Sequence, residues 1–432
     1  MDELTHGFRV DEAACDGCLA CMRACPTYAI RVKHGKARVL SQSCIDCGSC
    51  LKACSRGAIT ATTRTLAEFD HFAFKVAIPS PVLYGHFPLE VRPEHIVDGL
   101  LAAGFDAVWD YGIDLRLVTL ANVDYVKRWR GPRPVISIMC PVVVRLLQVS
   151  YPRMLEQLIQ VHPPREVAGR EVKRHYSQEL GLAPEQIAAI YVTPCQARTV
   201  SILQPAEGGR SYLDGSVGIP QVFNTVLVEA REAARTGRRR SEWSPVRSAD
   251  VLRLSLRRPI TELLTKHRYL SVAGLPNVIR VFDDIEKGKL KDFDYLECYA
   301  CWGGCANGNL TVDNVYVTLA KLQSLMNELP ETDPRTEEEV ARRYPHEDYS
   351  LPRAPQPRAA VVVGDLRERV RRKRKADRIA AILPGLDCGL CGAPACKVLA
   401  RDVAAGEAER GDCVFLSRQR LEELRRIHRR PE

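Results

Sequence analysis

The sequence has little that would place the protein in a membrane. No apolar run approaches the roughly 18 residues that a membrane-spanning helix needs. Residues 1–7, Met-Asp-Glu-Leu-Thr-His-Gly, are acidic and lack the apolar core of a signal peptide. We therefore expect a cytoplasmic protein without membrane insertion.

The sequence also lacks the usual features of nucleic-acid and nucleotide binding. Aromatic residues make up only 6% of the chain and do not alternate with the basic runs, so they offer no platform on which bases could stack. No Gly-Lys-Ser or Gly-Lys-Thr follows a Gly-Gly pair, which excludes a phosphate-binding loop of that type. We therefore expect no nucleic-acid partner, although the formal net charge is +9.

Cysteine, in contrast, is abundant. The chain has 17 cysteines among 432 residues, and the absence of an export signal favours metal sites over disulfides, because the cytosol keeps thiols reduced. Eight cysteines lie between residues 15 and 54, four between 388 and 413, and four in three short segments described below, which leaves Cys298 alone. A [4Fe-4S] cluster with its four thiolates carries about −2, so clusters at these sites would balance much of the basic excess.

The eight N-terminal cysteines form a duplicated motif. Residues 15–26 read Cys-x2-Cys-x2-Cys-x3-Cys-Pro, and residues 44–54 repeat the cysteine spacing about 29 residues later. This pattern is typical of a bacterial two-cluster ferredoxin, in which three thiolates of one motif and the last thiolate of the other hold each [4Fe-4S] cluster. Zinc sites rarely show this spacing. We assign one cluster to Cys15, Cys18, Cys21 and Cys54, and the second to Cys44, Cys47, Cys50 and Cys25.

Another cysteine motif lies near the end of the chain. Cys388, Cys391, Cys396 and Cys413 have the spacing Cys-x2-Cys-x4-Cys-x16-Cys, and nearby glycines let the loop wrap around a metal. The spacing favours a third [4Fe-4S] cluster, with zinc as the alternative. Arg and Lys residues dominate 367–375 in an expected helix, which presents either a solvated face or a patch for an acidic partner or nucleic acid.

Between these ends the sequence predicts an α/β domain over residues 66–330, because short apolar runs alternate with amphipathic helical stretches. The expected strands are 72–79, 107–109, 135–138, 187–192 and 277–281. The expected helices are 94–103, 115–127, 142–160 with a break near Pro152, 166–180, 216–234, 260–266 and 312–329. Six prolines amid charged residues between 330 and 357 indicate a linker, placed at 331–365. A two-[4Fe-4S] ferredoxin domain (1–65) precedes the α/β domain, and a small [4Fe-4S] domain with basic helices (366–432) follows the linker.

Three segments of the α/β domain carry further motif cysteines. They read Ile-Met-Cys-Pro around Cys140, Val-Thr-Pro-Cys-Gln-Ala-Arg around Cys195, and Tyr-Ala-Cys-Trp-Gly-Gly-Cys-Ala-Asn-Gly from Tyr299. In this order and at these separations, the segments resemble the catalytic domain of [FeFe]-hydrogenases. The resemblance implies a two-lobed fold and an H-cluster, which joins a [4Fe-4S] cluster to a di-iron subcluster. It implies that Cys140, Cys195, Cys301 and Cys305 hold the [4Fe-4S] half and that Cys305 bridges to the di-iron half.

The resemblance also implies other site residues, some of which depart from the family pattern. Arg198 stands where the family has a lysine that contacts a cyanide of the di-iron unit, and Tyr299 stands where it has a methionine. Gly303 and Gly304 let the backbone approach the cluster closely. Asn309 interrupts the usual glycine run, so the fit of the di-iron unit is left open.

The family's proton route is replaced at the positions that can be aligned. Met139 stands where a relay cysteine precedes the first ligand, and methionine has no ionisable proton. An ungapped alignment places Leu120 and Val123 at two glutamates of the route, and Ile159 at a serine. Cys298 is either an inert buried thiol or a relay from another direction. His162, aligned with a lysine, is a further candidate shuttle near pH 7.

By this resemblance the sequence keeps the four cysteine ligands of the H-cluster but lacks the residues of the family's proton route. This combination predicts a protein that senses H2 or turns it over slowly. Two alternatives stay open: a catalytic hydrogenase subunit with a different proton path, and an iron–sulfur electron-transfer protein without the di-iron unit. The order of domains resembles the sensory groups of the family. We expect H2 as the ligand, and a redox partner protein, a separate signalling chain and the hydrogenase maturation proteins as partners.

Overall fold

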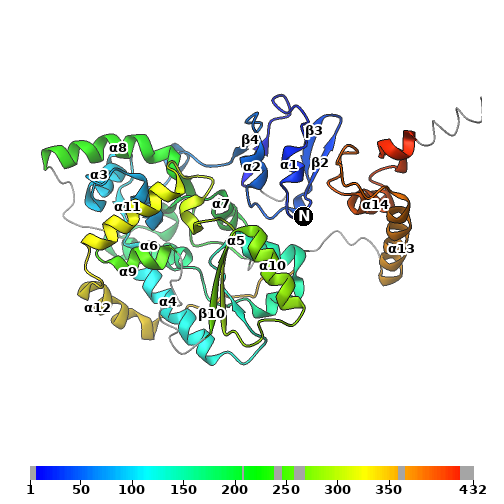
Figure 1. Ribbon diagram of the computed structural model, residues 1–432. Coiled ribbons are helices and arrows are strands. Elements are labelled where there is room, and N and C mark those ends of the chain that lie inside the picture. Colours follow the sequence, from blue (N-terminus) through cyan, green and yellow to red (C-terminus); the bar gives the residue numbers. More distant parts are fainter. Residues whose placement is uncertain (1–5, 207–208, 238–245, 257–267, 359–364, 419–432) are drawn as a thin grey trace, which may run out of the picture.

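The computed structural model describes residues 6–206, 209–237, 246–256, 268–358 and 365–418. It shows a mixed α/β protein in which a small N-terminal module lies between a large central domain and a C-terminal helical domain (Figure 1). Within these ranges, no helix combines the length and the apolar character needed to cross a membrane.

The N-terminal module consists of two antiparallel strand pairs and two short helices. β1 (Phe8–Val10) pairs with β4 (Ile59–Ala61), and β2 (Ile30–Lys33) pairs with β3 (Lys36–Val39). The turn between β2 and β3 places His34 and Gly35 at positive φ, as tight hairpins require. Helices α1 (Ala20–Arg23) and α2 (Ser49–Ala53) contain the third cysteine of each triplet, Cys21 and Cys50. The cysteines themselves make up much of the small core, so the fold of this module depends on them.

Two parallel sheets form the central domain. The first has the order β6-β5-β8-β9, and the second has the order β10-β11-β7. Their bounds are β5 (Phe74–Pro79), β6 (Ala107–Val108), β7 (Val135–Ile136), β8 (Ile187–Thr193), β9 (Gly215–Gly218), β10 (Tyr269–Ala273) and β11 (Tyr295–Tyr299). Strands β8 and β11 are buried along their whole length, as expected for parallel sheets covered on both faces.

Helices cover these sheets and enclose the apolar cores of the central domain (Figure 1). They are α3 (Pro93–Ala102), α4 (Tyr111–Arg128), α5 (Pro141–Ser150), α6 (Pro164–Leu180), α7 (Gln196–Leu203), α8 (Ile219–Thr236), α9 (Ala249–Ser255), α10 (Leu275–Glu286) and α11 (Val315–Glu328). Short 3-10 helices are η1 (Ser41–Ser43), η2 (Leu66–Phe69), η3 (Pro81–His86), η4 (Pro152–Gln157), η5 (Pro184–Gln186), η6 (Gly304–Asn307), η7 (Tyr344–His346) and η8 (Arg410–Asp412).

One expected strand is a helix. Residues 277–281 were expected in a strand, but they belong to α10, and the strand β10 lies just before it. Pro276 occupies the first turn of α10, where a missing N–H costs nothing. The buried side chains Leu275, Val278 and Phe282 recur at helical spacing. The helix expected at 260–266 lies outside the described residues.

The segment expected as a linker is largely packed on the central domain. It contains α12 (Pro334–Arg343), whose first turn is capped by Asp333 through a hydrogen bond from the Thr336 amide. Val340 is buried in the apolar core. Pro334 therefore lies in the first turn of a helix and does not mark a break within a linker.

The C-terminal domain consists of α13 (Leu366–Ile382), a cysteine-bearing loop, and α14 (Cys396–Ala405). The two helices pack against each other, and the domain lies against the N-terminal module rather than the central domain (Figure 1). The basic helix expected after residue 416 falls mostly in residues 419–432, which are not described.

Candidate iron–sulfur centres

The N-terminal module encloses two small cavities, each surrounded by four cysteines. Site 1 is lined by Cys15, Cys18, Cys21 and Cys54, and site 2 by Cys25, Cys44, Cys47 and Cys50. Each site takes three thiols from one motif and the last thiol from the other, which is the grouping that the spacing predicted. Four thiols around one cavity form the donor set of a [4Fe-4S] cluster, so the residues fit this group.

The same arrangement recurs in the C-terminal domain. Site 3 is a cavity lined by Cys388, Cys391, Cys396 and Cys413. The loop closes on itself through the amide of Cys396, which donates to the carboxylate of Asp387 at 2.6 Å. Four thiols again surround one space, so the donor set suits a [4Fe-4S] cluster, while zinc would accept the same four ligands.

The central site is built at the carboxyl ends of strands from both sheets. Cys195 follows β8 of the first sheet, whereas Cys140 and Cys301 follow β7 and β11 of the second. Cys140 and Cys195 are also the residues at which α5 and α7 begin. The two lobes therefore meet at these cysteines, and Cys305 reaches the same place from the glycine-rich loop.

Burial disfavours thiolates at the central site unless a metal compensates for them. Burial raises the pKa of Cys195 to about 11, and the neighbouring thiolates oppose the favourable effect of Arg198. Burial likewise raises the pKa of Cys140 and Cys301. Because iron would replace the protons and keep the sulfurs deprotonated, this donor set fits a metal cluster and not free thiolates.

Glycines let the two cysteine loops approach each other. Gly303 and Gly304 both have positive φ, and a Cβ at Gly303 would lie 2.5 Å from the Val315 side chain. A Cβ at Gly308 would lie 2.0 Å from the carbonyl oxygen of Pro194, next to Cys195. Only glycine fits at 308, so this residue fixes the separation of the two loops.

Arg198 and Tyr299 contact the central site in different ways. Nη2 of Arg198 donates to Sγ of Cys305 at 3.0 Å, and Nη1 donates to Oη of Tyr191 at 2.7 Å. Arg198 therefore holds its positive charge against the sulfur of Cys305. Tyr299 points its hydroxyl to the buried carboxylate of Glu297, at 2.8 Å. Burial and the Glu297 charge raise the pKa of Tyr299 far above the usual value for tyrosine.

The positions aligned with the family's proton route are apolar and packed. Met139 is half-buried beside Cys140, and its amide donates to the hydroxyl of Ser137 at 3.2 Å. Val123 and Ile159 belong to the apolar core, and Leu120 packs against that core. None of these four side chains carries an exchangeable proton, so they cannot relay one.

The two other candidate relays are also unsuited to this task. Burial lowers the pKa of His162 to about 4, so its imidazole is neutral near pH 7. Cys298 is fully buried on β11, and burial raises the pKa of its thiol well above the usual value. Cys298 lines none of the cavities of sites 1 to 3.

Site 2 adjoins the central site through residues that the sequence did not reveal as functional. Gln196, directly after Cys195, donates to the carbonyl oxygen of Asp46 at 2.9 Å, and Asn309 donates to the carbonyl oxygen of Cys47 at 3.3 Å. A Cβ at Gly48 would collide with the amide group of Asn309. The signal in the sequence was the asparagine that interrupts the glycine run.

A buried ion pair strengthens this junction. Asp46, between Cys44 and Cys47 of site 2, contacts the guanidinium of Arg145 on α5 and lies 3.3 Å from Nδ1 of His6. Burial opposes ionisation of Asp46, but the hydrogen bond to His6 and the charge of Arg145 lower its pKa below the usual value. The ferredoxin-like module is therefore fixed to the central domain by charge as well as by packing.

Comparisons with known proteins agree with this architecture. Residues 73–215 match the family model "Iron only hydrogenase large subunit, C-terminal domain", residues 8–55 match "4Fe-4S dicluster domain", and residues 383–415 match the iron–sulfur model named FeS. The three matches fall in the central domain, the N-terminal module and the C-terminal domain, respectively. They identify an iron–sulfur protein. The chain is an [FeFe]-hydrogenase-like protein with a ferredoxin-like domain before its central domain and an FeS domain after it.

Individual relatives are distant. Iron hydrogenase 1 of Clostridium pasteurianum is 22% identical over 306 residues, which cover 59% of this chain and 52% of that protein. The periplasmic [Fe] hydrogenase large subunit of Nitratidesulfovibrio vulgaris is 23% identical over 367 residues, 70% of this chain and 86% of that one. The probable cytosolic Fe-S cluster assembly factor of Culex quinquefasciatus is 22% identical over 312 residues, 58% of this chain and 64% of that one. The chain thus spans about half the length of the first of these relatives.

Among solved structures, the [FeFe]-hydrogenase of Chlamydomonas reinhardtii aligns with a TM-score of 0.47 and 16% identity, over 65% of this chain and 91% of that one.

Proposed function

We propose that this protein binds H2 at an H-cluster held by Cys140, Cys195, Cys301 and Cys305, and that it senses H2 or turns it over slowly. One observation carries the proposal: four thiols converge between the lobes beside Met139, which cannot relay protons. A site that keeps its ligands but lacks a fast proton route suits detection of H2 better than rapid turnover.

The residues of the central site would hold the cluster and shape its surroundings. The four cysteines supply the thiolates, and Gly303 and Gly304 bring the backbone close. Arg198 holds a positive charge against Cys305, in a place where its side chain is 9% exposed. When bound, the di-iron unit supplies an open iron position at which H2 is cleaved heterolytically.

A second function has support from the same contact. Arg198 at 3.0 Å from the Cys305 sulfur occupies space next to the expected bridging thiolate. A protein that holds only a [4Fe-4S] cluster there would transfer electrons without binding H2. The similarity to a protein named for Fe-S cluster assembly, at an identity close to that of the hydrogenases, also favours this alternative.

Infrared spectroscopy distinguishes the two functions. The protein is matured anaerobically with the di-iron subcluster, and spectra are recorded before and after H2 is added. Bands in the CO and CN region that shift with H2 support the first function, together with about 18 iron atoms per chain. An empty region with about 16 iron atoms supports the second function and overturns the first.

The proposal includes partners. H2 would be the ligand, a redox partner protein would exchange electrons, and hydrogenase maturation proteins would deliver the di-iron unit. A sensing role would also require a separate signalling chain. The third candidate is a catalytic subunit with another proton path, and the effect of Met139→Cys, described below, separates it from the sensor.

A further inference from the structure

The C-terminal domain is joined to the N-terminal module by a buried ion pair. Arg31 of β2 donates from Nε to Oδ2 of Asp402 on α14 at 2.6 Å, and from Nη2 to Oδ1 at 3.0 Å. Each residue is only 8% exposed. A bidentate contact of this kind fixes the orientation of the two domains as well as their distance, because both guanidinium donors must meet both carboxylate oxygens.

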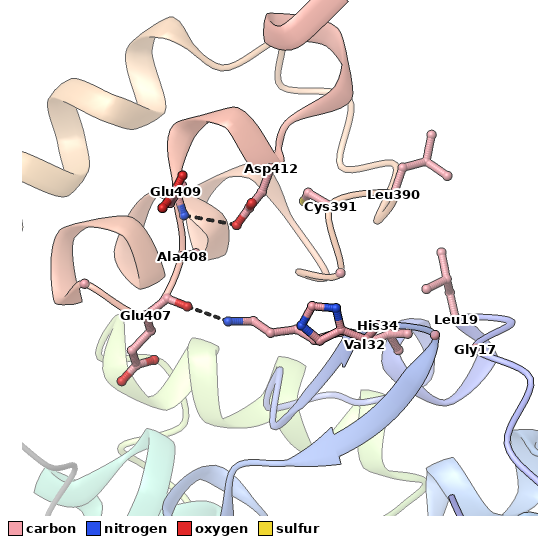
Figure 2. A pocket seen from close by; sticks show the side chains of 14 residues that line it. Gly17, Leu19, Val32, His34, Leu390, Cys391, Glu407, Ala408, Glu409 and Asp412 are labelled. Atoms are coloured by element: carbon pink, nitrogen blue, oxygen red, sulfur yellow. Dashed lines mark hydrogen bonds between the residues drawn. The ribbon is translucent and has the colours of Figure 1, made fainter. Parts of the chain in front are cut away.

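The contact brings the loops of sites 1 and 3 together. The amide of Val32 donates to the carbonyl oxygen of Gly392 at 3.0 Å, and a Cβ at Gly392 would lie 1.9 Å from the Val32 oxygen. Figure 2 shows Gly17 and Leu19 of the site 1 loop opposite Leu390 and Cys391 of the site 3 loop across a shared cavity. The ligand loops of the two sites therefore face each other.

The four cysteine sites consequently follow one another through the molecule. Site 3 faces site 1 across the docking contact. Sites 1 and 2 adjoin within the N-terminal module, where Cys21 and Cys50 influence each other electrostatically. Site 2 meets the central site at Gly48 and Asn309. Site 3 is therefore the outermost position, and the central site is the innermost.

The C-terminal domain has a basic helix face, and it has exposed apolar side chains next to site 3. Arg367, Arg371, Arg374 and Arg378 are exposed and recur at intervals of four, three and four residues on one face of α13. This face lies opposite the buried stripe that contains Ala376 and Ile379. Val414 and Phe415, which line site 3, are 45% and 37% exposed. An exposed positive face on the domain that holds site 3 is complementary to a negatively charged partner.

We propose that the C-terminal domain is the electron port of this protein and that it docks an acidic one-electron carrier protein. The carrier is oxidised by one electron as the site 3 cluster is reduced by one electron, and the reverse holds when electrons leave. No bond to a ligand or proton changes in this exchange. The inference rests on the iron–sulfur part of the proposed function and not on the di-iron unit.

The docking contact is tested by electron paramagnetic resonance of the fully reduced protein. In the wild type, we expect the site 3 signal to be broadened by magnetic interaction with site 1. Asp402→Lys places two positive charges at the buried contact, so it is expected to release a sharp, uncoupled signal at full iron content. The double variant Arg31→Glu/Asp402→Lys should restore the coupling, and Asp377→Lys, on the exposed face of α13, should leave it unchanged. A coupled signal in Asp402→Lys, or no rescue by the double variant, would overturn the proposed docking.

The port is tested by stopped-flow reduction of the clusters with a reduced, acidic two-cluster ferredoxin. Replacement of Arg367, Arg371 and Arg374 by Glu should lower the second-order rate about tenfold at low salt, and the wild-type rate should fall as salt is added. Reduction by methyl viologen, which needs no docking surface, should be unchanged. The matched control Arg231→Glu, on exposed α8 of the central domain, should behave as wild type.

Each outcome of this experiment has one meaning. An unchanged rate with ferredoxin, or an equal loss in Arg231→Glu, overturns the port. The triple Glu variant could lose affinity for a DNA duplex while its clusters are reduced at the wild-type rate. That result would assign the basic face to nucleic acid and would also overturn the port. Absence of a site 3 signal in the wild type would defeat the third cluster itself, whereas the infrared result on H2 leaves the port untouched.

Discussion

Arg198 donates a hydrogen bond to the sulfur of Cys305 at 3.0 Å while it also holds the hydroxyl of Tyr191. Two donors of one planar guanidinium are therefore engaged in different directions, which a compact ammonium group cannot do with the same geometry. The guanidinium charge is held against the Cys305 sulfur, and Arg198 is buried. Arg198 thus acts on the charge of the central site whether or not a di-iron unit is bound.

Removal of this charge should lower the reduction potential of the central cluster. The reduced cluster is more negative, so it gains more from Arg198 than the oxidised cluster does. We expect Arg198→Gln to shift the potential down by about 60 mV, which is a tenfold change for one electron. A redox titration followed by electron paramagnetic resonance measures the shift. Arg198→Lys should retain most of the potential, and an unchanged value in Arg198→Gln would contradict this role.

A cysteine at position 139 should make the matured protein a faster catalyst. Met139→Cys introduces an exchangeable proton beside Cys140, whereas Met139→Leu keeps the apolar character. H2 production from a reduced viologen should rise in the first variant and stay at the wild-type level in the second. Measurable wild-type turnover that Met139→Cys leaves unchanged would instead favour a working hydrogenase with another proton path.

The grouping of thiols can be checked by iron analysis. Cys54→Ser removes one ligand from site 1, and the cluster there should lose one iron or all four, out of about 16 in the four [4Fe-4S] sites. Cys298→Ser is the matched control because Cys298 lies in none of the cavities of sites 1 to 3. It should retain full iron, and full activity in this variant would also exclude a relay role for Cys298. Intact site 1 signals in Cys54→Ser would refute the assignment.

Asp114 should make the protein less stable as the pH rises. This carboxyl is fully buried, accepts from Nε1 of Trp109 at 2.7 Å, and pairs with Arg343 at 3.2 Å. Burial raises its pKa to about 7 from the usual 3.8. Between these two pKa values the folded state binds a proton that the unfolded state has lost. Protonation of Asp114 therefore stabilises the folded state fully below about pH 4, and this stabilisation is lost as the pH rises through 7.

The Asp114→Asn variant measures that contribution. The difference in unfolding free energy between wild type and Asp114→Asn should change by about 1.4 kcal/mol for each pH unit between about pH 4 and 7. Thermal unfolding of both proteins across this range tests it. Asp377→Asn, an exposed change, should show no such trend. A constant difference across the range would show that Asp114 ionises normally in the folded protein.

The grouping of the cysteines at sites 1 to 3 could be predicted because their spacings form recognisable motifs. Fixed spacings between cysteines limit how the loops can close, so the grouping of Cys15 with Cys54 followed from the motif alone. The prediction of a strand at 277–281 was wrong for a local reason. A short apolar run is compatible with a strand or a helix, and Pro276 in the first turn favours the helix. Prolines between 330 and 357 predicted a linker, but Pro334 lies in the first turn of α12.

The contacts between domains could not be predicted from the sequence. Arg31 and Asp402 are 371 residues apart, and neither stands in a recognisable motif. The same holds for Gln196 with Asp46. Such pairs depend on how the domains pack against each other, whereas residue spacing and hydrophobic periodicity indicate only the structure within one domain.

The contact between Arg31 and Asp402 also sets an order of events during synthesis. At about 5–20 residues per second, the ribosome needs roughly 20–70 s to travel from β2 to α14. During that interval the face of the N-terminal module beside site 1 lies open to solvent. Iron can be delivered to this face, or oxygen can damage it, until the C-terminal domain covers it. The C-terminal domain thereby closes the access to a cysteine site that was made earlier in the same chain.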